Sequence, residues 1–226
     1  MVADFHSHIL PGIDDGSASV EQSLQMLRRE QQQGITRVVA TPHFYAQQDN
    51  PRRFIARRQK SYERLMEALR GEDLPQITLG AEVYYFRGIS EWEELELLAF
   101  QGSRYIMVEM PMAKWTEGMY RELAAIRDKR GLVPVVAHVD RYISPLRTHK
   151  IPEKLADLPV LVQANAHFFT GKLTRGMALR MLKNDAIHLL GSDCHDLTER
   201  PPCLGEAVEI IRKNLGGRAL EPIVQT

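Results

Sequence analysis

The sequence carries no excess of charge, because 29 Lys and Arg residues balance 29 Asp and Glu residues among its 226 positions. A chain without a net field does not attract nucleic acid or anionic lipid through bulk electrostatics, so we expect neither as a partner. No apolar run is long enough to span a membrane, and the first residues lack the basic and apolar regions of a signal peptide. We therefore expect a cytoplasmic protein without membrane insertion.

Cysteine and linker sequence are equally scarce. Cys194 and Cys203 are too few for a disulfide framework and are compatible with free thiols in a reducing compartment. No Pro/Gly/Ser-rich linker or long charge run divides the chain, of which 44% is hydrophobic. A chain of this length can build a single core, so we predict one domain over residues 1–226.

What the sequence does contain is an alternation of short apolar runs and amphipathic segments. The apolar runs predict seven strands, near residues 2–5, 36–40, 76–79, 105–108, 133–137, 160–164 and 186–191. Helical spacing predicts helices between Ser19 and Gly34, from about 54 to 69, from about 116 to 130 and from about 204 to 215. Near-continuous apolar strands indicate a parallel sheet that is buried on both faces. We predict an α/β fold closed into a seven-stranded (β/α)7 TIM-like barrel, with an open doubly wound sheet as the alternative.

One apolar stripe requires a choice between core and cofactor contact. It recurs at helical spacing between positions 54 and 69 and consists of Phe54, Ile55, Tyr62, Leu65, Met66 and Leu69. Such stripes usually pack into a protein core, so we expect all six residues to be core residues.

Side chains that can bind metals follow almost every predicted strand. His6 and His8 are spaced i, i+2, so they point to one face of the first strand. Eight such residues follow strands: His6, His8, His43, Glu82, Glu109, His138, Asp193 and His195. In a barrel the C-terminal ends of the strands hold the active site, and eight ligands exceed the needs of one ion.

This ligand chemistry points to phosphoryl transfer. Two or three divalent ions are expected, and imidazole and carboxylate ligands without thiolate favour manganese, iron or zinc over calcium or magnesium. Ions about 3.5 to 4 Å apart, bridged by a carboxylate, can clamp an in-line displacement at phosphorus.

Several motifs resemble those of the polymerase-and-histidinol-phosphatase (PHP) superfamily. They are DFHSH (4–8), TPH (41–43), GAE (80–82), Glu109, AHVDRY (137–142) and SDCH (192–195). The segments LPGIDDG (10–16), GAEVYY (80–85), HVDRY (138–142) and RPP (200–202) are similar to the bacterial PHP-type tyrosine-protein phosphatases of capsule and exopolysaccharide systems. The resemblance covers roughly residues 2–215, in order.

The resemblance implies a distorted seven-stranded barrel with three metal ions. The implied ligands are His6, His8, Glu82 and Asp193 for the first ion, Glu82, Glu109 and His138 for the second, and Asp15, His43 and His195 for the third. Asp14 stays open as an alternative to Asp15. Arg141 and Arg200 match arginines that grip the phosphate without touching the metals, a role that suits a fork of donors facing a dianion.

The implied reaction is hydrolysis of phosphotyrosine on the tail of a bacterial tyrosine kinase, by metal-bound hydroxide and without a phosphoenzyme. Tyrosine is a comparatively good leaving group, with an unperturbed pKa of about 10, so a dedicated general acid is not expected. Two other readings remain: a phosphatase of small esters such as histidinol phosphate, and a non-enzymatic interaction module stabilised by metal. A shallow rim would suit a protein tail, and a deep pocket would suit a small ester.

A rival mechanism comes from Cys194 and Arg200, which have the C-x5-R spacing of thiol-based tyrosine phosphatases. The segment between them contains Asp196 and Glu199 and no glycine, and carboxylates oppose a thiolate. We therefore expect Cys194 to turn away from the metals.

Three histidines lie off the ligand pattern. Surface or core roles are expected for His149 and His188, whereas the role of His167 stays open. The oligomeric state and the role of the tail, residues 218–226, also stay open.

Overall fold

The computed structural model describes residues 2–143 and 150–220, and its strands are short and all paired in parallel. They are β1 (Val2–Ser7), β2 (Ile35–Ala40), β3 (His43–Phe44), β4 (Gln76–Leu79), β5 (Glu82–Tyr84), β6 (Tyr105–Glu109), β7 (Val133–Val136), β8 (Leu161–Asn165) and β9 (Leu189–Gly191). Each of the seven predicted strand positions is confirmed. The two additional strands, β3 and β5, directly follow β2 and β4.

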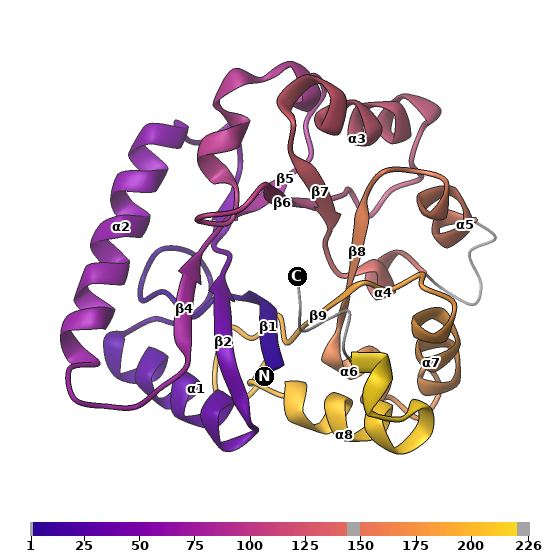
Figure 1. Cartoon of the computed structure of the whole chain (residues 1–226). Coiled ribbons are helices and arrows are strands. Elements are labelled where there is room, and N and C mark those ends of the chain that lie inside the picture. The colour runs from indigo at the N-terminus through magenta and orange to yellow at the C-terminus, as the bar shows by residue number, and fades with distance from the viewer. Residues whose placement is uncertain (1, 144–149, 221–226) are drawn as a thin grey trace.

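The strands form a curled parallel sheet with the long helices on its outside (Figure 1). Hydrogen bonding divides it into two sheets, ordered β1-β2-β4 and β3-β5-β6-β7-β8-β9. An isolated parallel bridge between Ser7 and Cys194 links β1 to the segment after β9. The described strands thus form an α/β curl rather than one regular seven-stranded barrel. The hydrogen-bonding pattern is interrupted between β2 and β3, where Pro42 has no N–H to donate to a neighbouring strand.

The four predicted helices are confirmed as α1 (Val20–Gln32), α2 (Pro51–Ala68), α3 (Glu117–Arg130) and α8 (Leu204–Leu215). Local chemistry explains where the first three begin, because side chains of Ser19, Asn50 and Thr116 accept hydrogen bonds from the first backbone N–H groups. The shorter elements are α4 (Val139–Tyr142), α5 (Ile151–Ala156), α6 (Ala166–Thr170), α7 (Arg175–Lys183) and the 3-10 turns η1 (Ile89–Glu91), η2 (Glu93–Leu98) and η3 (Gly217–Leu220).

The inward face of α2 corrects one prediction. Phe54, Leu65 and Leu69 are buried, and Ile55 and Tyr62 pack against the core. The expectation that Met66 is a core residue is wrong, since its side chain is 39% exposed. A helix turns by about 100° per residue, so the position after a central buried leucine points off the buried face.

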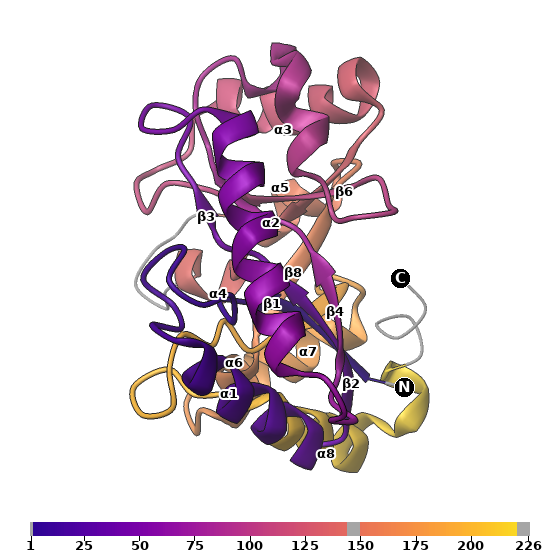
Figure 2. The ribbon, with the colours of Figure 1, turned by 90° about the vertical axis from the view of Figure 1, so that its left-hand side faces the viewer.

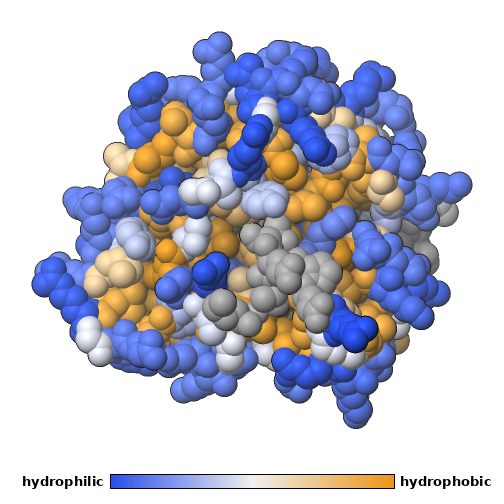
Figure 3. Space-filling model, viewed as in Figure 1, coloured by the Kyte–Doolittle hydropathy of each residue, from blue (hydrophilic) through white to orange (hydrophobic). Residues whose placement is uncertain are grey.

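The curled sheet has one edge where β1 begins and an opposite edge where loops follow the strands. Figure 2 shows α4 and the loops after β1 and β9 at one edge, whereas β1 begins at the opposite edge. Figure 3 shows the face that Figure 1 shows, with hydrophilic residues around the outline and apolar residues further in. The side chains described next lie at or just after the carboxyl ends of the strands.

Candidate metal centre

The innermost group of side chains comes from β1, β5 and the turn after β9. The Nε2 atom of His6 lies 3.2 Å from Glu82 Oε2 and 3.5 Å from Asp193 Oδ1. The Nε2 atom of His8 lies 3.3 Å and 3.6 Å from the same two oxygens, and the two Nε2 atoms are 3.2 Å apart. All four side chains are buried. The two imidazoles thus face both carboxylates, and atoms of His6, His8 and Asp193 lie close enough together to hold a metal ion.

The other nitrogen of each imidazole is held by a protein acceptor. Gln163 Oε1 lies 3.2 Å from His6 Nδ1, and Asp14 Oδ2 lies 2.7 Å from His8 Nδ1. When Nδ1 donates its proton there, the lone pair of Nε2 points into the group, an arrangement typical of metal-binding histidines. Sequence reasoning missed Gln163, although a polar residue within the apolar run of β8 was the available signal.

A second group lies on the other side of Glu82. Its Oε1 atom is 2.8 Å from His138 Nε2, and this nitrogen is 3.6 Å from Glu109 Oε1. The Nδ1 atom of His43 lies 3.0 Å from Glu82 Oε2 and 4.0 Å from Glu109 Oε2. The carboxylate of Glu82 therefore faces both groups, which is the geometry that a bridging ligand requires.

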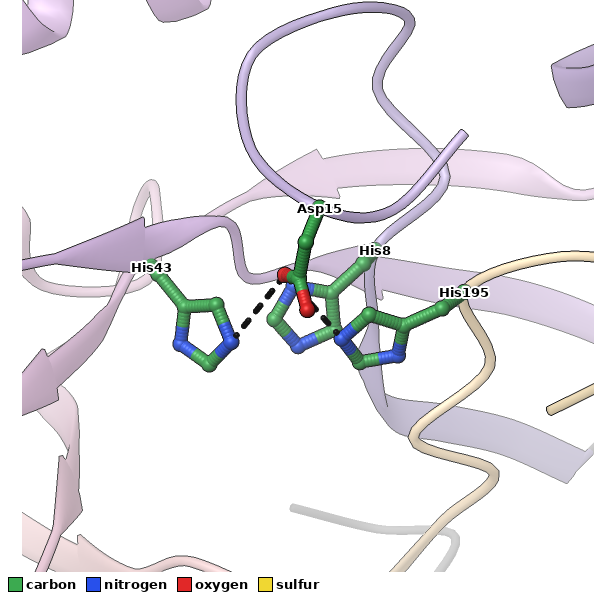
Figure 4. A group of neighbouring side chains, drawn as sticks. All are labelled: His8, Asp15, His43 and His195. Atoms are coloured by element: carbon green, nitrogen blue, oxygen red, sulfur yellow. Dashed lines mark ion pairs between the residues drawn. The ribbon is translucent and has the colours of Figure 1, made fainter. Parts of the chain in front are cut away.

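A third group surrounds Asp15, as Figure 4 shows. Its Oδ1 atom lies 3.4 Å from His43 Nε2 and 3.5 Å from His195 Nε2. The adjacent Asp14 instead accepts hydrogen bonds from His8 and from the backbone N–H groups of His43 and Gly16. The structure thus places Asp15, rather than Asp14, against the two histidines. His43 contacts two groups through its two nitrogens, although the sequence suggested only the third.

Unusual backbone geometry aims several of these side chains. His138 and Asp193 have φ values of 33° and 54°, in the left-handed region that side chains other than glycine rarely adopt. The carbonyl of Asp193 lies 2.9 Å from His195 Nδ1, which leaves Nε2 of that imidazole facing Asp15. At Gly191 a Cβ would lie 2.5 Å from His6 Cβ, so only glycine allows β9 to approach β1 this closely.

The electrostatics of the centre favour bound cations. Burial opposes ionisation of Glu82 and Asp193, but His6 and the other cationic groups around them together outweigh burial. They lower the pKa of Glu82 well below its usual value and that of Asp193 to about 2. Burial also opposes the charged form of His8, yet its hydrogen bonds and charge interactions with Asp14 and Glu82 together raise the pKa of His8 to about 10. These carboxylates are ionised at neutral pH, and a divalent ion would replace the imidazole protons.

Several buried atoms in the centre lack a hydrogen-bond partner. They include Glu82 Oε2, His43 Nδ1 and His195 Nε2. An unpartnered buried polar atom is costly, and nitrogen and oxygen lone pairs that face one point are what a divalent ion needs. The residues present therefore fit a cluster of divalent metal ions.

Two arginines flank the centre at its solvent-exposed side. Arg141, in α4, contacts Asp193 Oδ2, and Arg200 Nη2 lies 3.0 Å from Asp15 Oδ2. Their side chains are 32% and 40% exposed, respectively. Each guanidinium has five N–H donors, so it can contact a carboxylate and still donate to an anion at the mouth of the centre.

The geometry around Cys194 opposes a thiol mechanism. The thiol is fully buried, and burial, followed by the charge of Glu30, raises its pKa well above the ordinary value. Its sulfur groups with Asp4 and Glu30 rather than with the metal centre. The Oδ1 atom of Asp196 accepts hydrogen bonds from three backbone N–H groups, at residues 198–200. These N–H groups, which a thiol phosphatase would turn toward phosphate, already bind a carboxylate.

The remaining histidines lie away from the centre. His188 is half-buried, and its Nδ1 accepts a hydrogen bond from the N–H of Val162. His167 is exposed in α6, and His149 lies outside the described residues. None of the helices in the described ranges is long and apolar enough to cross a membrane.

Comparison with known proteins gives consistent matches along the chain. The family model for capsular polysaccharide synthesis proteins, CpsB/CapC, matches residues 2–226. The tyrosine-protein phosphatase CpsB of Streptococcus pneumoniae is 30% identical over 225 residues, covering 95% of this chain and 91% of the relative. The tyrosine-protein phosphatase YwqE of Bacillus subtilis (strain 168) is 28% identical over 224 residues, covering 94% and 85%.

A solved structure supports the same fold. It comes from work on YwqE of Bacillus subtilis and CpsB of Streptococcus pneumoniae, described as metal-dependent tyrosine phosphatases. The TM-score is 0.82 at 23% identity, and the match covers 96% of this chain and 89% of the other. The curled parallel α/β arrangement is therefore shared with that structure.

Proposed function

Because the chain belongs to the CpsB/CapC family of capsular polysaccharide synthesis, we propose that it is a metal-dependent tyrosine-protein phosphatase of capsule or exopolysaccharide systems. The observation that carries this proposal is the convergence of imidazole and carboxylate groups where the strands end, with buried lone pairs that lack hydrogen-bond partners. This arrangement suits a phosphoric monoester hydrolase that uses divalent ions.

The three side-chain groups suggest three ion positions. We assign His6, His8, Glu82 and Asp193 to the first, Glu82, Glu109 and His138 to the second, and Asp15, His43 and His195 to the third. The contact between His43 Nδ1 and Glu82 supports a position for His43 between the second and third ions. Manganese is the ion that we propose, with iron or zinc as alternatives compatible with these ligands.

Bound ions would lower the pKa of a water molecule so that it can attack phosphorus, and would offset negative charge on the phosphate. The chain itself positions the reactants. Asp14 and Gln163 hold the Nδ1 protons of His8 and His6, which keeps both Nε2 atoms free for ligation. The tyrosine oxygen can leave as a phenolate, so no residue is assigned as general acid.

Arg141 and Arg200 are proposed to bind the non-bridging phosphate oxygens. Both lie at the mouth of the centre, on carboxylates that belong to different ion positions. A phosphate held between them would receive charge-assisted hydrogen bonds from two sides. The arginines would thereby orient the phosphorus toward the attacking water.

The finer parts of the proposal concern substrate and setting. We propose the phosphotyrosine tail of a bacterial tyrosine kinase as substrate and the cytoplasm as location. Residues 1–226 would act as one catalytic domain. The Ser7–Cys194 bridge and the paths from β2 into β3 and from β4 into β5 support the interpretation of the curl as one distorted seven-stranded barrel. The relatives named as tyrosine-protein phosphatases favour this substrate over a small ester and over a non-enzymatic module.

A metal-depletion assay tests the proposal. The protein is stripped with a chelator, checked by elemental analysis and assayed on phosphotyrosine peptides and on histidinol phosphate. We expect activity on the peptides to disappear on stripping and to return with manganese. Full activity in metal-free protein would contradict the mechanism, and activity on histidinol phosphate alone would contradict the substrate.

A further inference from the structure

Four cations form a stripe along α2, the helix that lies beside the loop after β1 (Figure 2). This α2 stripe consists of Arg53, Arg57, Lys60 and Arg64, whose spacings of four, three and four residues place them on one helix face. All four are exposed. The stripe is about 16 Å long, which is the length of roughly five residues of extended peptide.

Two adjoining cavities connect the α2 stripe with the metal centre. A cavity of about 770 Å³ is lined by Asp15 and His43 of the centre and by the first two arginines of the stripe. A second cavity of about 280 Å³ is lined by the last three cations of the stripe and by residues 11–13. Arg57 lines both cavities, so the row of cations runs without a break from the cavity at the centre outward.

The α2 stripe carries more positive charge than its surroundings neutralise. Asp49 lies 2.6 Å from Arg57 Nη2 and 3.6 Å from Arg53 Nη2. Within residues 2–143 and 150–220, Lys60 and Arg64 have no ion-pair partner. Of the three carboxylates that line the first cavity, Asp14, Asp15 and Asp49, only Asp49 forms ion pairs with the stripe among the described residues. The cations of the stripe therefore outnumber these carboxylates, and the surplus favours an anionic partner along this face.

We infer that the α2 stripe binds an acidic segment of the protein substrate, next to the phosphotyrosine. This inference rests on the proposed function, which places the phosphotyrosine at the metal centre. The neighbouring residues would then pass through the shared cavity, where their carboxylates or further phosphates pair with the stripe. A lipid surface would contact exposed cations but would not enter a cavity that the stripe shares with His43 and Asp15. A peptide therefore fits better than a membrane.

The experiment compares two phosphotyrosine peptides, flanked on both sides by glutamates or by glutamines, with metal-loaded protein. We expect kcat/KM to favour the glutamate peptide about tenfold, as a few exposed ion pairs acting together would. In Lys60→Glu/Arg64→Glu, whose changes lie in the half of the stripe away from the centre, the preference should fall to about twofold or less. The preference should also shrink as ionic strength rises.

Arg52→Glu is the control for charge reversal elsewhere on the helix, since Arg52 is an exposed arginine of α2 that pairs with Glu94 outside both cavities. This variant should keep the preference. Equal kcat/KM for the two peptides in the unaltered protein, or an equal loss in Arg52→Glu, would overturn the inference. A second result would also overturn the inference. The protein would bind vesicles of equal parts phosphatidylglycerol and phosphatidylcholine, and Lys60→Glu/Arg64→Glu would weaken that binding but leave the peptide preference unchanged.

The failure of the proposed function would be recognised separately. If metal-loaded protein hydrolyses neither peptide, the phosphatase assignment fails. Fluorescence anisotropy with the unphosphorylated glutamate peptide then still tests the surface. Binding that is weakened by Lys60→Glu/Arg64→Glu and not by Arg52→Glu supports the α2 stripe as an acidic-peptide site, and no binding overturns it.

Discussion

Two groups of potential metal ligands lie close together in this protein, and only one has the character of a metal site. The metal centre gathers imidazoles and carboxylates, several of whose buried atoms lack a hydrogen-bond partner. The other group, the inner cluster of Asp4, Glu30 and Cys194, begins two residues before His6 on β1 and is fully buried, whereas Asp15 of the metal centre is exposed. Proximity of ligand types is the same in both groups, so it does not distinguish them.

The distribution of protons and donors does distinguish them. Asp4 Oδ1 accepts hydrogen bonds from the N–H groups of His6 and Ser192, and Oδ2 accepts one from the Ser192 hydroxyl. Burial, followed by the charge of Asp4, raises the pKa of Glu30 well above its usual value. Both oxygens of Glu30 are buried without a hydrogen-bond partner, like several atoms of the metal centre, but a protonated Glu30 has a proton that it can donate to Asp4. In the metal centre, in contrast, the pKa values of Glu82 and Asp193 are lowered, so charged carboxylates face the imidazoles there.

The largest expected effect is the loss of a ligand from the metal centre. Asp193→Ala or His195→Ala should lower the phosphatase activity about a hundredfold or more. Mutating a residue that only orients a metal ligand already lowers metal affinity or activity about ten- to hundredfold. Elemental analysis of Asp193→Ala should find less metal per chain. If metal content and kcat/KM were unaltered in both variants, the metal centre would not be the site of metal binding and catalysis. It would then be no different from the inner cluster.

Removing an arginine should have the next largest effect. Arg141→Ala and Arg200→Ala should each lower kcat/KM about ten- to hundredfold, the range expected when a charged hydrogen bond to phosphate is lost. Metal content should stay unchanged, and Arg141→Lys should restore only part of the activity because it lacks the guanidinium fork. Stoichiometric loss of metal in either alanine variant would instead assign that arginine to holding a metal-ligand carboxylate.

A third prediction concerns pH and stability in the inner cluster. Native Glu30 keeps its proton above the ordinary value of 4.5, so the native state binds more protons than the unfolded state between 4.5 and the raised pKa. The free energy of unfolding should therefore fall as pH rises through this window, by up to about 1.4 kcal/mol per pH unit. Glu30→Gln should remove that part of the slope in urea unfolding.

Exposed Glu21 provides the control for this measurement, since it lies on the same helix as Glu30. Glu21→Gln should leave the slope unchanged. Equal slopes in Glu30→Gln and in the unaltered protein would mean that Glu30 is ionised in the native state, and would make the inner cluster a candidate cation site after all.

The smallest effect is expected at Cys194. Cys194→Ser should keep most of the phosphatase activity, because the thiol lies in the inner cluster and its neighbours raise its pKa. Steady-state assays with a phosphotyrosine peptide measure this directly. An inactive serine variant with intact metal content would mean that the C-x5-R segment, not the metal centre, performs the chemistry.

The predictions made from sequence alone succeeded where the signal was local. Strand positions followed from apolar runs, and the four long helices followed from spacing and capping residues. The prediction that Met66 is a core residue was wrong because helical periodicity does not show where the buried face of a helix ends. The balance of 29 cations and 29 anions likewise hid the α2 stripe, since a net charge says nothing about how charges are distributed over a surface.

By itself the sequence determined which potential metal ligands occur and that they follow strands. Because parallel strands bring their C-terminal ends to one edge, it also determined that these side chains lie at the same edge. Only the tertiary structure decided which of them meet. Asp14 and Asp15 are adjacent and chemically identical, yet one hydrogen bonds His8 and the other faces His43 and His195. The direction of each side chain depends on backbone angles and packing partners that come from distant segments, such as Gln163 beside His6.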